Sequence, residues 1–483
     1  MFKKIELDNY ESFRHIEIDL TESEKNPLPY AFIYGENGSG KSNLIGSLSF
    51  LRNSIRTIKK NKFMDDFAIS EADMKAPNLS AKGSNPRDQE MLAPLDGMFK
   101  DLYGNAIEFM KKLNQLPLDI TDLAEGVRTI GSDTGVSTSY HFVLGGHDGN
   151  YVMKFGADNK LVHEKLSFVV GSRTRDIFEI CAFEKNDRPQ SNHLVDQKFS
   201  PQLFLNQEYS KAIDDLIKKY WGKHSLMAIL NEEYSANNTG YMDESVGTGI
   251  ADVIRFFNSI IVSCKYDVYK ETRGISERIL TRLDNGNINV SEKSKLMRYE
   301  GALNSFFTRI YSDIKKAYYK IETHDEIIEY TLFFSKMIGG KKREISISNE
   351  STGTQRLLTL FPVFLECARG KTVFYDELDS GIHDLLIREI MSELVKEFKG
   401  QFIATTHNTS LLEVMDPKSV FVIQVDPKGE KRILPINRIE RTQKNHNNRN
   451  RYLNGVFSGI PITGEIDFSE IVQHADDELG EMR

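Results

Sequence analysis

Residues 32–48 read FIYGENGSGKSNLIGSL, and this stretch specifies the fold more strongly than any other. Its centre, Gly35 to Ser42, fits the pattern G-x-x-x-x-G-K-[ST] of a phosphate-binding loop. The apolar run from Tyr30 to Tyr34 predicts a buried strand before the loop, and the apolar periodicity from Asn43 to Arg52 predicts a helix after it. This context is the one that the pattern requires, so the stretch predicts a nucleoside triphosphate site. A chance glycine-rich turn is the alternative.

The residues of the loop have distinct expected roles. Its three glycines let the backbone curl so that successive N–H groups point at phosphate oxygens, and the helix N-terminus adds partial positive charge. Lys41 is expected to reach the β- and γ-phosphates, and Ser42 to hold Mg²⁺. The predicted nucleotide-binding residues of the loop are Gly35, Asn37, Gly38, Ser39, Gly40, Lys41, Ser42 and Asn43.

Composition sets outer limits on the function. The 483 residues are 40% hydrophobic and 27% charged, which is typical of a globular chain of two or three domains. No run of eighteen apolar residues and no signal-type N-terminus is present, so we expect a cytoplasmic protein without a membrane partner. The three cysteines lack metal or redox spacing and indicate a reduced compartment. The net charge of −8 gives no global attraction to nucleic acid.

Two acids follow a second apolar strand. Residues 371–379 read KTVFYDELD, in which Thr372 to Tyr375 predict a strand. The C-terminal edge of a parallel strand faces the nucleotide crevice, so Asp376 is expected to reach the Mg²⁺ shell and Glu377 to polarise an attacking water. A solvated acidic turn is the alternative interpretation.

A histidine closes a third strand. Residues 401–407 read QFIATTH, and a helical pattern from His383 to Phe398 lies between this strand and the acidic one. A right-handed strand–helix–strand unit brings both strand ends to one edge of the sheet. His407 would then contact the γ-phosphate or the attacking water as a catalytic residue, although a lone histidine at a strand end is often structural.

A small polar group precedes the acidic strand. Residues 350–367 read ESTGTQRLLTLFPVFLEC, and a helix is expected from about Gln355 to Ala368. Ser351 and Gly353 therefore lie at a helix N-terminus. Serine is favoured there as a cap, and the same end of a helix also binds anions.

The order of these motifs resembles that of ABC-type ATPases of the SMC, RecF and OLD group, and more closely the short OLD-like ATPases of bacterial abortive-infection and anti-phage systems. The resembling stretches are IELDNYESFRHIEIDL, ESTGTQRLL, YDELDSGIH, TTHN and RYLNGVFSGIP. In this group two subunits sandwich ATP. The resemblance implies that Ser351 and Gly353 of one subunit close over the γ-phosphate bound by the other, and that Asp379, in the D-loop, is a nucleotide-binding residue.

The sequence departs from the transporter members of the ABC class. Their Ser-Gly-Gly-Gln signature is replaced by Ser351-Thr352-Gly353-Thr354, a pattern similar to OLD-like ATPases. Gln207, in FLNQEYS, is a weak candidate for the Q-loop glutamine. The stretch NKFMD has the wrong spacing for a guanine-binding motif, so ATP is favoured over GTP.

The fold class expected from these patterns is α/β, a P-loop NTPase of ABC type with a mixed core sheet, an antiparallel β lobe and a helical insertion. GGHDGN at 145–150 predicts a hairpin in the β lobe. The middle of the chain lacks the sustained heptads of an SMC coiled coil. The expected division is an ATPase domain at 1–60 and 325–465, a β lobe at 61–200, a helical insertion for self-association or docking at 201–324, and a C-terminal tail at 466–483.

Two basic stretches, GGKKREISI and NRIERTQKNHNNRNR, are candidate phosphate contacts, although a solvated surface is the commoner explanation. Neither contains the interleaved aromatic residues that stack single-stranded bases. OLD proteins carry a Toprim nuclease, which needs a glutamate and an Asp-x-Asp cluster. The stretch at 421–436 offers one aspartate on a hairpin instead, so we expect the effector chemistry in a separate chain.

The leading hypothesis is an ATP-hydrolysing switch that forms a homodimer or higher oligomer around ATP and Mg²⁺. It would control a separately encoded toxin or nuclease in anti-phage defence. A RecF-like DNA-repair or DNA-clamping ATPase is the main alternative. A non-hydrolysing scaffold is disfavoured because Glu377 is intact, and a transporter motor is disfavoured by the altered signature.

Overall fold

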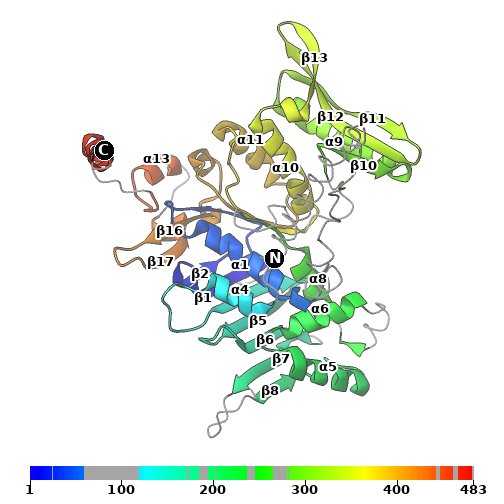
Figure 1. Ribbon diagram of the computed structural model, residues 1–483, viewed down its shortest axis with the longest axis vertical. Helices are drawn as coiled ribbons and strands as arrows, with labels where there is room; N and C mark the ends of the chain where they lie inside the picture. The colour runs from blue at the N-terminus through cyan, green and yellow to red at the C-terminus, as the bar shows by residue number, and fades with distance from the viewer. Residues whose placement is uncertain are drawn as a thin grey trace, which may run out of the picture.

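The computed structural model describes most of the chain. The described residues are 1–23, 26–58, 119–170, 173–183, 194–201, 203–236, 245–247, 249–264, 280, 282–441, 447–460 and 466–480. The segment 59–118, which includes NKFMD and much of the expected β lobe, lies outside them. Figure 1 shows three layers along the long axis, with the phosphate-loop helix α1 close to the middle.

The middle layer is a six-stranded sheet with the order β17-β16-β3-β15-β14-β9. All neighbours pair in parallel except β16 and β17, which form an antiparallel hairpin. The mixed core sheet expected from the sequence is therefore confirmed. Its strands are β3 (Tyr30–Tyr34), β9 (Ile261–Ser263), β14 (Thr372–Tyr375), β15 (Gln401–Thr405), β16 (Val420–Val425) and β17 (Lys431–Pro435).

Both faces of this sheet are buried, which explains why its strands read as continuous apolar runs rather than alternating ones. In β3, Ala31 and Ile33 face one hydrophobic core, whereas Phe32 and Tyr34 face the other. The carboxyl ends of β3, β14 and β15 share one edge because the strands run parallel. That edge is where the phosphate loop, the two acids and the histidine emerge.

A seven-stranded antiparallel sheet lies on one side of the core, with the order β2-β1-β4-β5-β6-β7-β8. Strand β1 pairs with β4 across more than a hundred intervening residues, so the first strands of the chain and the later β lobe form one sheet. The strands are β1 (Phe2–Tyr10), β2 (Phe13–Asp19), β4 (Ser137–Leu144), β5 (His147–Phe155), β6 (Leu161–Val170), β7 (Arg173–Phe183) and β8 (Leu194–Phe199).

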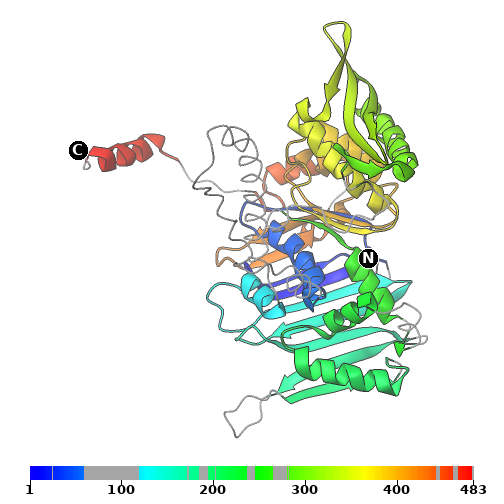
Figure 2. The same ribbon diagram turned by 45° about the vertical axis from the view of Figure 1, so that its right-hand side comes forward.

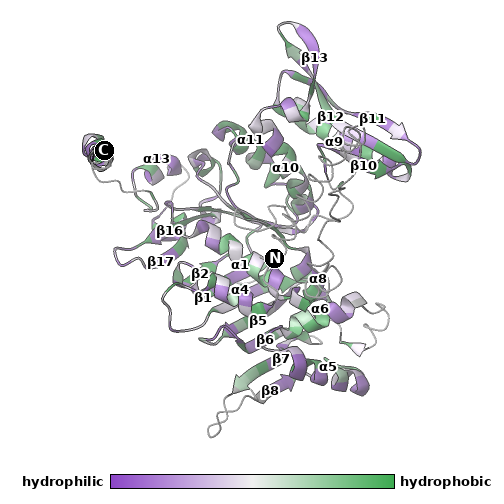
Figure 3. Cartoon of the chain, viewed as in Figure 1, coloured by the Kyte–Doolittle hydropathy of each residue, from purple (hydrophilic) through white to green (hydrophobic). Residues whose placement is uncertain are grey.

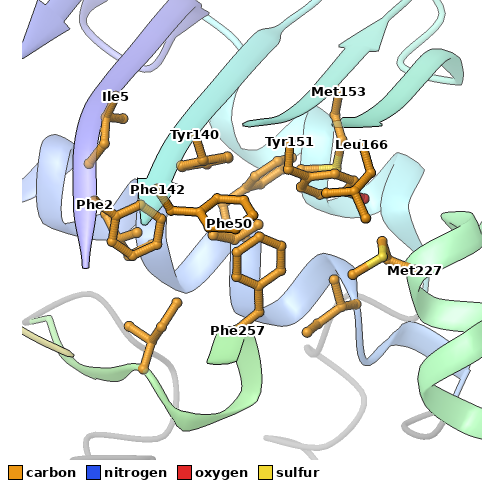
Figure 4. Close-up of a cluster of buried hydrophobic side chains, with 14 of the residues drawn as sticks. Phe2, Ile5, Phe50, Tyr140, Phe142, Tyr151, Met153, Leu166, Met227 and Phe257 are labelled. Carbon is orange, nitrogen blue, oxygen red and sulfur yellow. The ribbon is translucent and has the colours of Figure 1, made fainter. Parts of the chain in front are cut away.

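Helices cover one face of this antiparallel sheet, and α1 among them also contacts strands of the core sheet. They are α1 (Lys41–Ser54), α4 (Ile120–Val127), α5 (Gln207–Tyr220), α6 (Leu226–Ala236) and α8 (Ile250–Ser259). Figure 4 shows Phe50 of α1 and Phe257 of α8 reaching the aromatic side chains of β4 and β5. Helix α5 buries residues at intervals of four, Tyr209, Ile213 and Ile217, and turns a largely hydrophilic side outward in Figure 3.

The N-terminal strand is joined to the core sheet by one buried glutamine. Gln401 accepts a hydrogen bond from the Phe2 N–H at 2.7 Å and donates to the Phe2 and Leu28 carbonyls at 2.8 and 3.0 Å. Its side chain thereby satisfies backbone groups that would otherwise be buried without partners.

The expected helical insertion at 201–324 is corrected, because this segment also contains strands. Strand β9 belongs to the core sheet. The third layer is a separate four-stranded sheet, in which β10 (Asn285–Asn289) and β11 (Ile314–His324) join β12 (Ile327–Ile338) and β13 (Lys341–Ser346). The helical pattern holds only for α5, α6, α8 and α9 (Lys293–Ile310). Short apolar runs such as that of β9 do not distinguish a buried strand from a helix, which is why the sequence misled. The domain boundaries themselves remain a proposal.

Helices α10 (Thr352–Ala368) and α11 (Asp384–Leu394) cover the core sheet on the side of this small sheet. The remaining helices are the short α12 (Ile436–Ile439) and α13 (Asn448–Leu453), and α14 (Phe468–Gly480), which stands apart from the body in Figure 2. None of the helices within the described residues combines the length and apolar character needed to cross a membrane.

Candidate functional site

The phosphate loop joins β3 to α1 as the sequence predicts. Gly40 caps α1 in a left-handed conformation, with φ of +102°. A Cβ atom at this position would lie 2.5 Å from Cζ of Phe13, which is fully buried at the start of β2. Glycine is therefore required at residue 40 both by the backbone and by the close approach of the β1–β2 hairpin. This hairpin explains why an aromatic turn near the N-terminus accompanies the loop.

The side chain of Lys41 folds back onto the backbone of its own loop. Its Nζ atom donates to the carbonyls of Gly35 and Glu36 at 2.9 and 3.0 Å. Burial lowers the pKa of this lysine, and the negative charges of three acids that follow β14 oppose that shift. An ammonium group has three donors, so one can meet a phosphate oxygen while the loop contacts are kept.

Those acids are held by a threonine at the end of the neighbouring strand. The Thr405 hydroxyl donates to Asp376 Oδ1 at 2.6 Å and accepts from the Glu377 N–H at 2.8 Å. Glu377 itself adopts a left-handed backbone with φ of +51°, which is costly for a residue with a side chain. One hydroxyl thus fixes both the carboxylate of Asp376 and the backbone turn at Glu377.

His407 lies at the same edge, two residues beyond β15. Partial burial and the Lys41 charge lower its pKa, whereas Asp379, Glu377 and Asp376 act in the opposite direction. The imidazole is therefore predominantly neutral near pH 7 and can donate one N–H. The structure brings the phosphate-loop lysine, both acids and the histidine together, as the strand order requires.

The D-loop acid Asp379 is engaged within the chain. Its Oδ1 atom accepts from the Thr406 hydroxyl at 2.7 Å, and both carboxylate oxygens lie 3.3 Å from the His407 N–H. Its observed contacts therefore fix the histidine turn. The nucleotide-binding role expected for Asp379 remains a proposal.

The residues fit a nucleotide with a divalent cation. Asp376 is 4% exposed, and its Oδ2 atom is buried without a hydrogen-bond partner among the described residues. The hydroxyl of Ser39, 1% exposed, is buried and likewise lacks a partner in that part of the chain. Such groups are costly unless something satisfies them. Carboxylate and hydroxyl oxygens are the ligands that Mg²⁺ prefers, and Ser42, which follows Ser39 closely in the chain, lies in the first turn of α1.

Gly353 permits the signature region to approach the D-loop. A Cβ at Gly353 would lie 2.8 Å from the Gly381 carbonyl. Ser351 caps α10, its hydroxyl accepting from the Thr354 N–H at 3.2 Å, and its side chain is exposed. Within the described residues, no hydrogen bond links Ser351 or Gly353 to the phosphate loop. Both interpretations of Ser351, a helix cap and an exposed anion site, remain compatible with this geometry.

Gln355 and Arg356 continue the signature helix toward the site. The Gln355 amide donates to three carbonyls of the preceding turn, those of residues 347, 348 and 350. The Arg356 guanidinium packs on the Tyr375 ring at 5.2 Å and lies 3.5 Å from the Glu377 carbonyl. The start of α10 is therefore mechanically linked to the acidic turn.

Four contacts beside the loop could not be found from the sequence. Lys431, on β17, donates to the Gly38 carbonyl at 3.0 Å and to the Ser12 hydroxyl at 2.8 Å. The amide of Asn43 donates to the same hydroxyl at 2.8 Å. Cys264, just after β9, contacts the Ser42 carbonyl at 3.7 Å. No local sequence pattern predicts these contacts, because each joins segments far apart in the sequence.

Gln207 is not placed at the site. It is the first residue of α5, exposed, in the antiparallel lobe, and no hydrogen bond links it to the phosphate loop in the described part of the chain. The weak Q-loop assignment is therefore corrected. The exposed N-terminal turn of α5 is capped by Asn206, which explains its polar sequence.

Comparison with known proteins gives one family match. Residues 257–413 match the family described as "AAA domain, putative AbiEii toxin, Type IV TA system". The match runs from α8 past His407, less than half of the chain, and does not include the phosphate loop. It agrees with the resemblance to ABC-type ATPases that the motifs indicate. None of the curated proteins matches this chain.

Solved structures similar to the chain include three SMC head domains. They are an SmcHead bound to the C-winged helix domain of ScpA (14% identity, TM-score 0.39, 90% of this chain and 96% of that one), and the SMC head domain from Thermotoga maritima (14%, 0.35, 90% and 98%). The third is an Smc head domain with an extended coiled coil bound to the C-terminal domain of ScpA derived from Pyrococcus furiosus (13%, 0.34, 90% and 95%).

Proposed function

We propose that the protein binds and hydrolyses ATP between two copies of itself, and that this cycle switches a separately encoded effector. The observation that carries the proposal is the division of the site. The phosphate loop, the two acids and the histidine meet at one sheet edge, whereas the exposed Ser351 hydroxyl at the cap of α10 bonds to Thr354 and, within the described residues, has no hydrogen bond to the phosphate loop. A second copy can supply that cap to the γ-phosphate.

The chain's own residues would divide the work as follows. Lys41 and the loop N–H groups bind the phosphates, and Ser42 with Asp376 would hold Mg²⁺, which offsets phosphate charge. Glu377 orients and deprotonates the attacking water, while neutral His407 donates to the γ-phosphate. The signature residues Ser351 and Gly353 of the partner copy would meet the same phosphate, aided by the helix dipole.

Hydrolysis would then remove a charge that both copies bind. The closed arrangement is stabilised by the interactions that the two copies make with the shared γ-phosphate, and the open arrangement lacks them. An effector that prefers one arrangement is therefore released or retained according to the nucleotide. The contact between Arg356 and the Glu377 carbonyl offers a route from the acidic turn to α10. The "putative AbiEii toxin, Type IV TA system" wording of the matched family supports a toxin-linked role. We propose that this role belongs to anti-phage defence in the cytoplasm.

Complementation between two inactive variants tests the shared site. Lys41→Ala should lose ATP binding, because no other group in the loop replaces its charge. Ser351→Arg should keep ATP binding by the single subunit and block closure and hydrolysis. A mixed dimer contains one composite site with an intact loop facing an intact cap. Mixing the variants should therefore restore part of the hydrolysis that neither has alone, measured as phosphate release.

Two results would contradict this proposal. The first is full hydrolysis by Ser351→Arg on its own, which would remove the sandwich. The second is no recovery although mixed dimers are demonstrated by differently tagged chains. Ser351→Ala is the matched control, because it removes the hydroxyl without adding bulk. It should weaken closure less than Ser351→Arg does, since the helix N-terminus and Gly353 can still approach the phosphate.

A nucleic-acid role is a second candidate, and one surface favours it. On the outer side of the small sheet, Lys316 lies 5.2 Å from the ring centroid of Tyr318, and Lys320 lies 4.2 Å from that of Phe333. The two rings are neighbours across β11 and β12. Lysines interleaved with aromatic rings are typical of surfaces that bind single strands, although Glu344 neutralises Lys320.

Fluorescence anisotropy with labelled single-stranded and duplex DNA separates the two functions. If DNA is the ligand, wild type binds and stimulates phosphate release, and Lys316→Glu with Lys320→Glu weakens binding and flattens its salt dependence. Equal anisotropy with and without protein would remove this candidate and leave the effector switch.

A further inference from the structure

A group of three potential metal ligands lies on the outer face of the antiparallel sheet, away from the nucleotide site. His163 is on β6, and Glu179 and Cys181 are on β7. The strands pair His163 directly with Cys181, and Lys165 with Glu179. Side chains at alternate positions share one face, so the three point the same way, while Glu164 points into the core.

The three side chains already converge. One ligand atom from each, an imidazole nitrogen, a carboxylate oxygen and a sulfur, lies within 4.8 Å of the other two. Nε2 of His163 is 3.0 Å from Glu179 Oε1, and the Nδ1 atom of His163 is buried with no hydrogen-bond partner in the part of the chain that the structure describes. A half-buried imidazole with one unsatisfied nitrogen, next to a thiol and a carboxylate, is an unusual combination for a sheet surface.

We propose that His163, Glu179 and Cys181 bind one Zn²⁺ ion. The mixed nitrogen, sulfur and oxygen set suits zinc, which is borderline soft, and does not suit Mg²⁺ or Ca²⁺, which need oxygen ligands. A thiolate and a carboxylate would together neutralise the ion. Three protein ligands leave a fourth tetrahedral position for water.

The neighbouring charges permit Glu179 to bind a metal ion. Lys165 lies 3.8 Å from Glu179 but 2.8 Å from Asp176, so it keeps its closer partner when Glu179 turns to the metal. Asp196 of β8 stands directly opposite Cys181 in the register. It adds negative charge beside Cys181, which favours a cation there.

The consequence is a clip between β6 and β7. Strand β6 carries Glu164 on its inner face, and the carboxylate of Glu164 anchors the start of α6 through the Leu226 N–H. Metal bound on the outer face would therefore stabilise the lobe that supports the phosphate-loop helix. Because structural metal binding adds to folding free energy, the protein should unfold at a higher temperature with the ion present.

Cobalt substitution tests the site directly. Co²⁺ is added to the metal-free full-length protein without nucleotide, and the near-ultraviolet thiolate-to-cobalt charge-transfer band is recorded. We expect one Co²⁺ per chain, a band that Zn²⁺ abolishes by displacement, and loss of the band in Cys181→Ser. His163→Ala should weaken binding and leave the metal-free protein folded.

Matched cysteine variants serve as controls. Cys264→Ser and Cys367→Ser should retain the band, since Cys264 lies beside the phosphate loop and Cys367 is buried in the other core. The proposal is overturned if no band forms with excess Co²⁺, or if the band persists in Cys181→Ser. A Zn²⁺-induced rise in unfolding temperature that is equal in wild type and in His163→Ala with Cys181→Ser would also overturn it.

Discussion

Two buried carboxylates, one in each large sheet, are satisfied in opposite ways. Glu164, in the antiparallel sheet, accepts hydrogen bonds from the Tyr151 hydroxyl and the Trp221 indole at 2.9 Å, and from two N–H groups at the start of α6. Asp376, at the edge of the core sheet, accepts one bond from Thr405, and its second oxygen has no hydrogen-bond partner within the described ranges. The Glu164 carboxylate therefore stabilises the fold as an internal brace, whereas the Asp376 carboxylate has one oxygen available to a ligand.

The contrast separates structural from functional charges within one protein. Full satisfaction stabilises the fold, whereas an unsatisfied buried oxygen lowers stability and is kept where a ligand completes it. Changes at the core edge should therefore alter chemistry with little effect on folding. Substitutions at Glu164 should instead lower the stability of the fold with little direct effect on the chemistry.

The largest effect is expected for Glu377→Gln. The variant should bind ATP but hydrolyse it slower by about 10²–10⁴, the scale for losing a positioned base, which corresponds to about 3–5 kcal/mol. Single-turnover phosphate release together with calorimetric ATP binding measures both properties. A wild-type rate of hydrolysis would mean that Glu377 has only a structural role in the backbone turn after β14. An unchanged unfolding temperature would show that the core edge is separable from stability.

Glu164→Ala should produce the next largest effect, on folding. Three buried donors and the half-buried Trp221 indole lose their acceptor. Each unsatisfied buried donor costs about 1–3 kcal/mol, with partial relief if water enters, so we expect a loss of about 3 kcal/mol or more. Denaturant unfolding measures it. The exposed Glu397→Ala is the control and should stay within about 0.5 kcal/mol of wild type. Equal losses in the two variants would refute the role of Glu164 as a brace.

Asp376→Asn should change stability least among the carboxylate variants, by within about 1 kcal/mol of wild type and in the stabilising direction. Asparagine keeps one oxygen for Thr405 and removes a buried charge. Mg²⁺-dependent ATP hydrolysis should nevertheless be lost. A marked destabilisation in thermal unfolding would show that Asp376 is also a brace, and the contrast between the two sheets would disappear.

The smallest effect is a pH dependence of the brace in the antiparallel sheet. Burial raises the pKa of Glu164 above its ordinary value of 4.5, against the opposing effect of its hydrogen bonds. A raised folded-state pKa stabilises the fold below the ordinary value, and this contribution is lost as pH rises through the folded pKa. The stability difference between wild type and Glu164→Gln should therefore shift against wild type as pH rises from 4.5. A shift of opposite sign would show that the hydrogen bonds dominate.

Local sequence was sufficient for the parts of the site that are continuous in the chain. Residues 35–42 adopt the predicted loop because glycine spacing, a buried strand and a helix start are all local properties. The strands that precede Asp376 and His407 were likewise predictable, and parallel pairing placed their ends at one edge. The placement of Ser351 at a helix N-terminus follows from cap preferences in the same way.

Long-range packing, by contrast, determined which distant side chains lie at the carboxyl edge of the core sheet. Thr405 bridges the two acids, Lys431 reaches the Gly38 carbonyl from β17, and Phe13 forces glycine at residue 40. It also placed β9 in the core sheet and the proposed metal ligands of β6 and β7 on one face. Strand order and register depend on how whole faces pack against their neighbours, and a short apolar run carries no information about its partner.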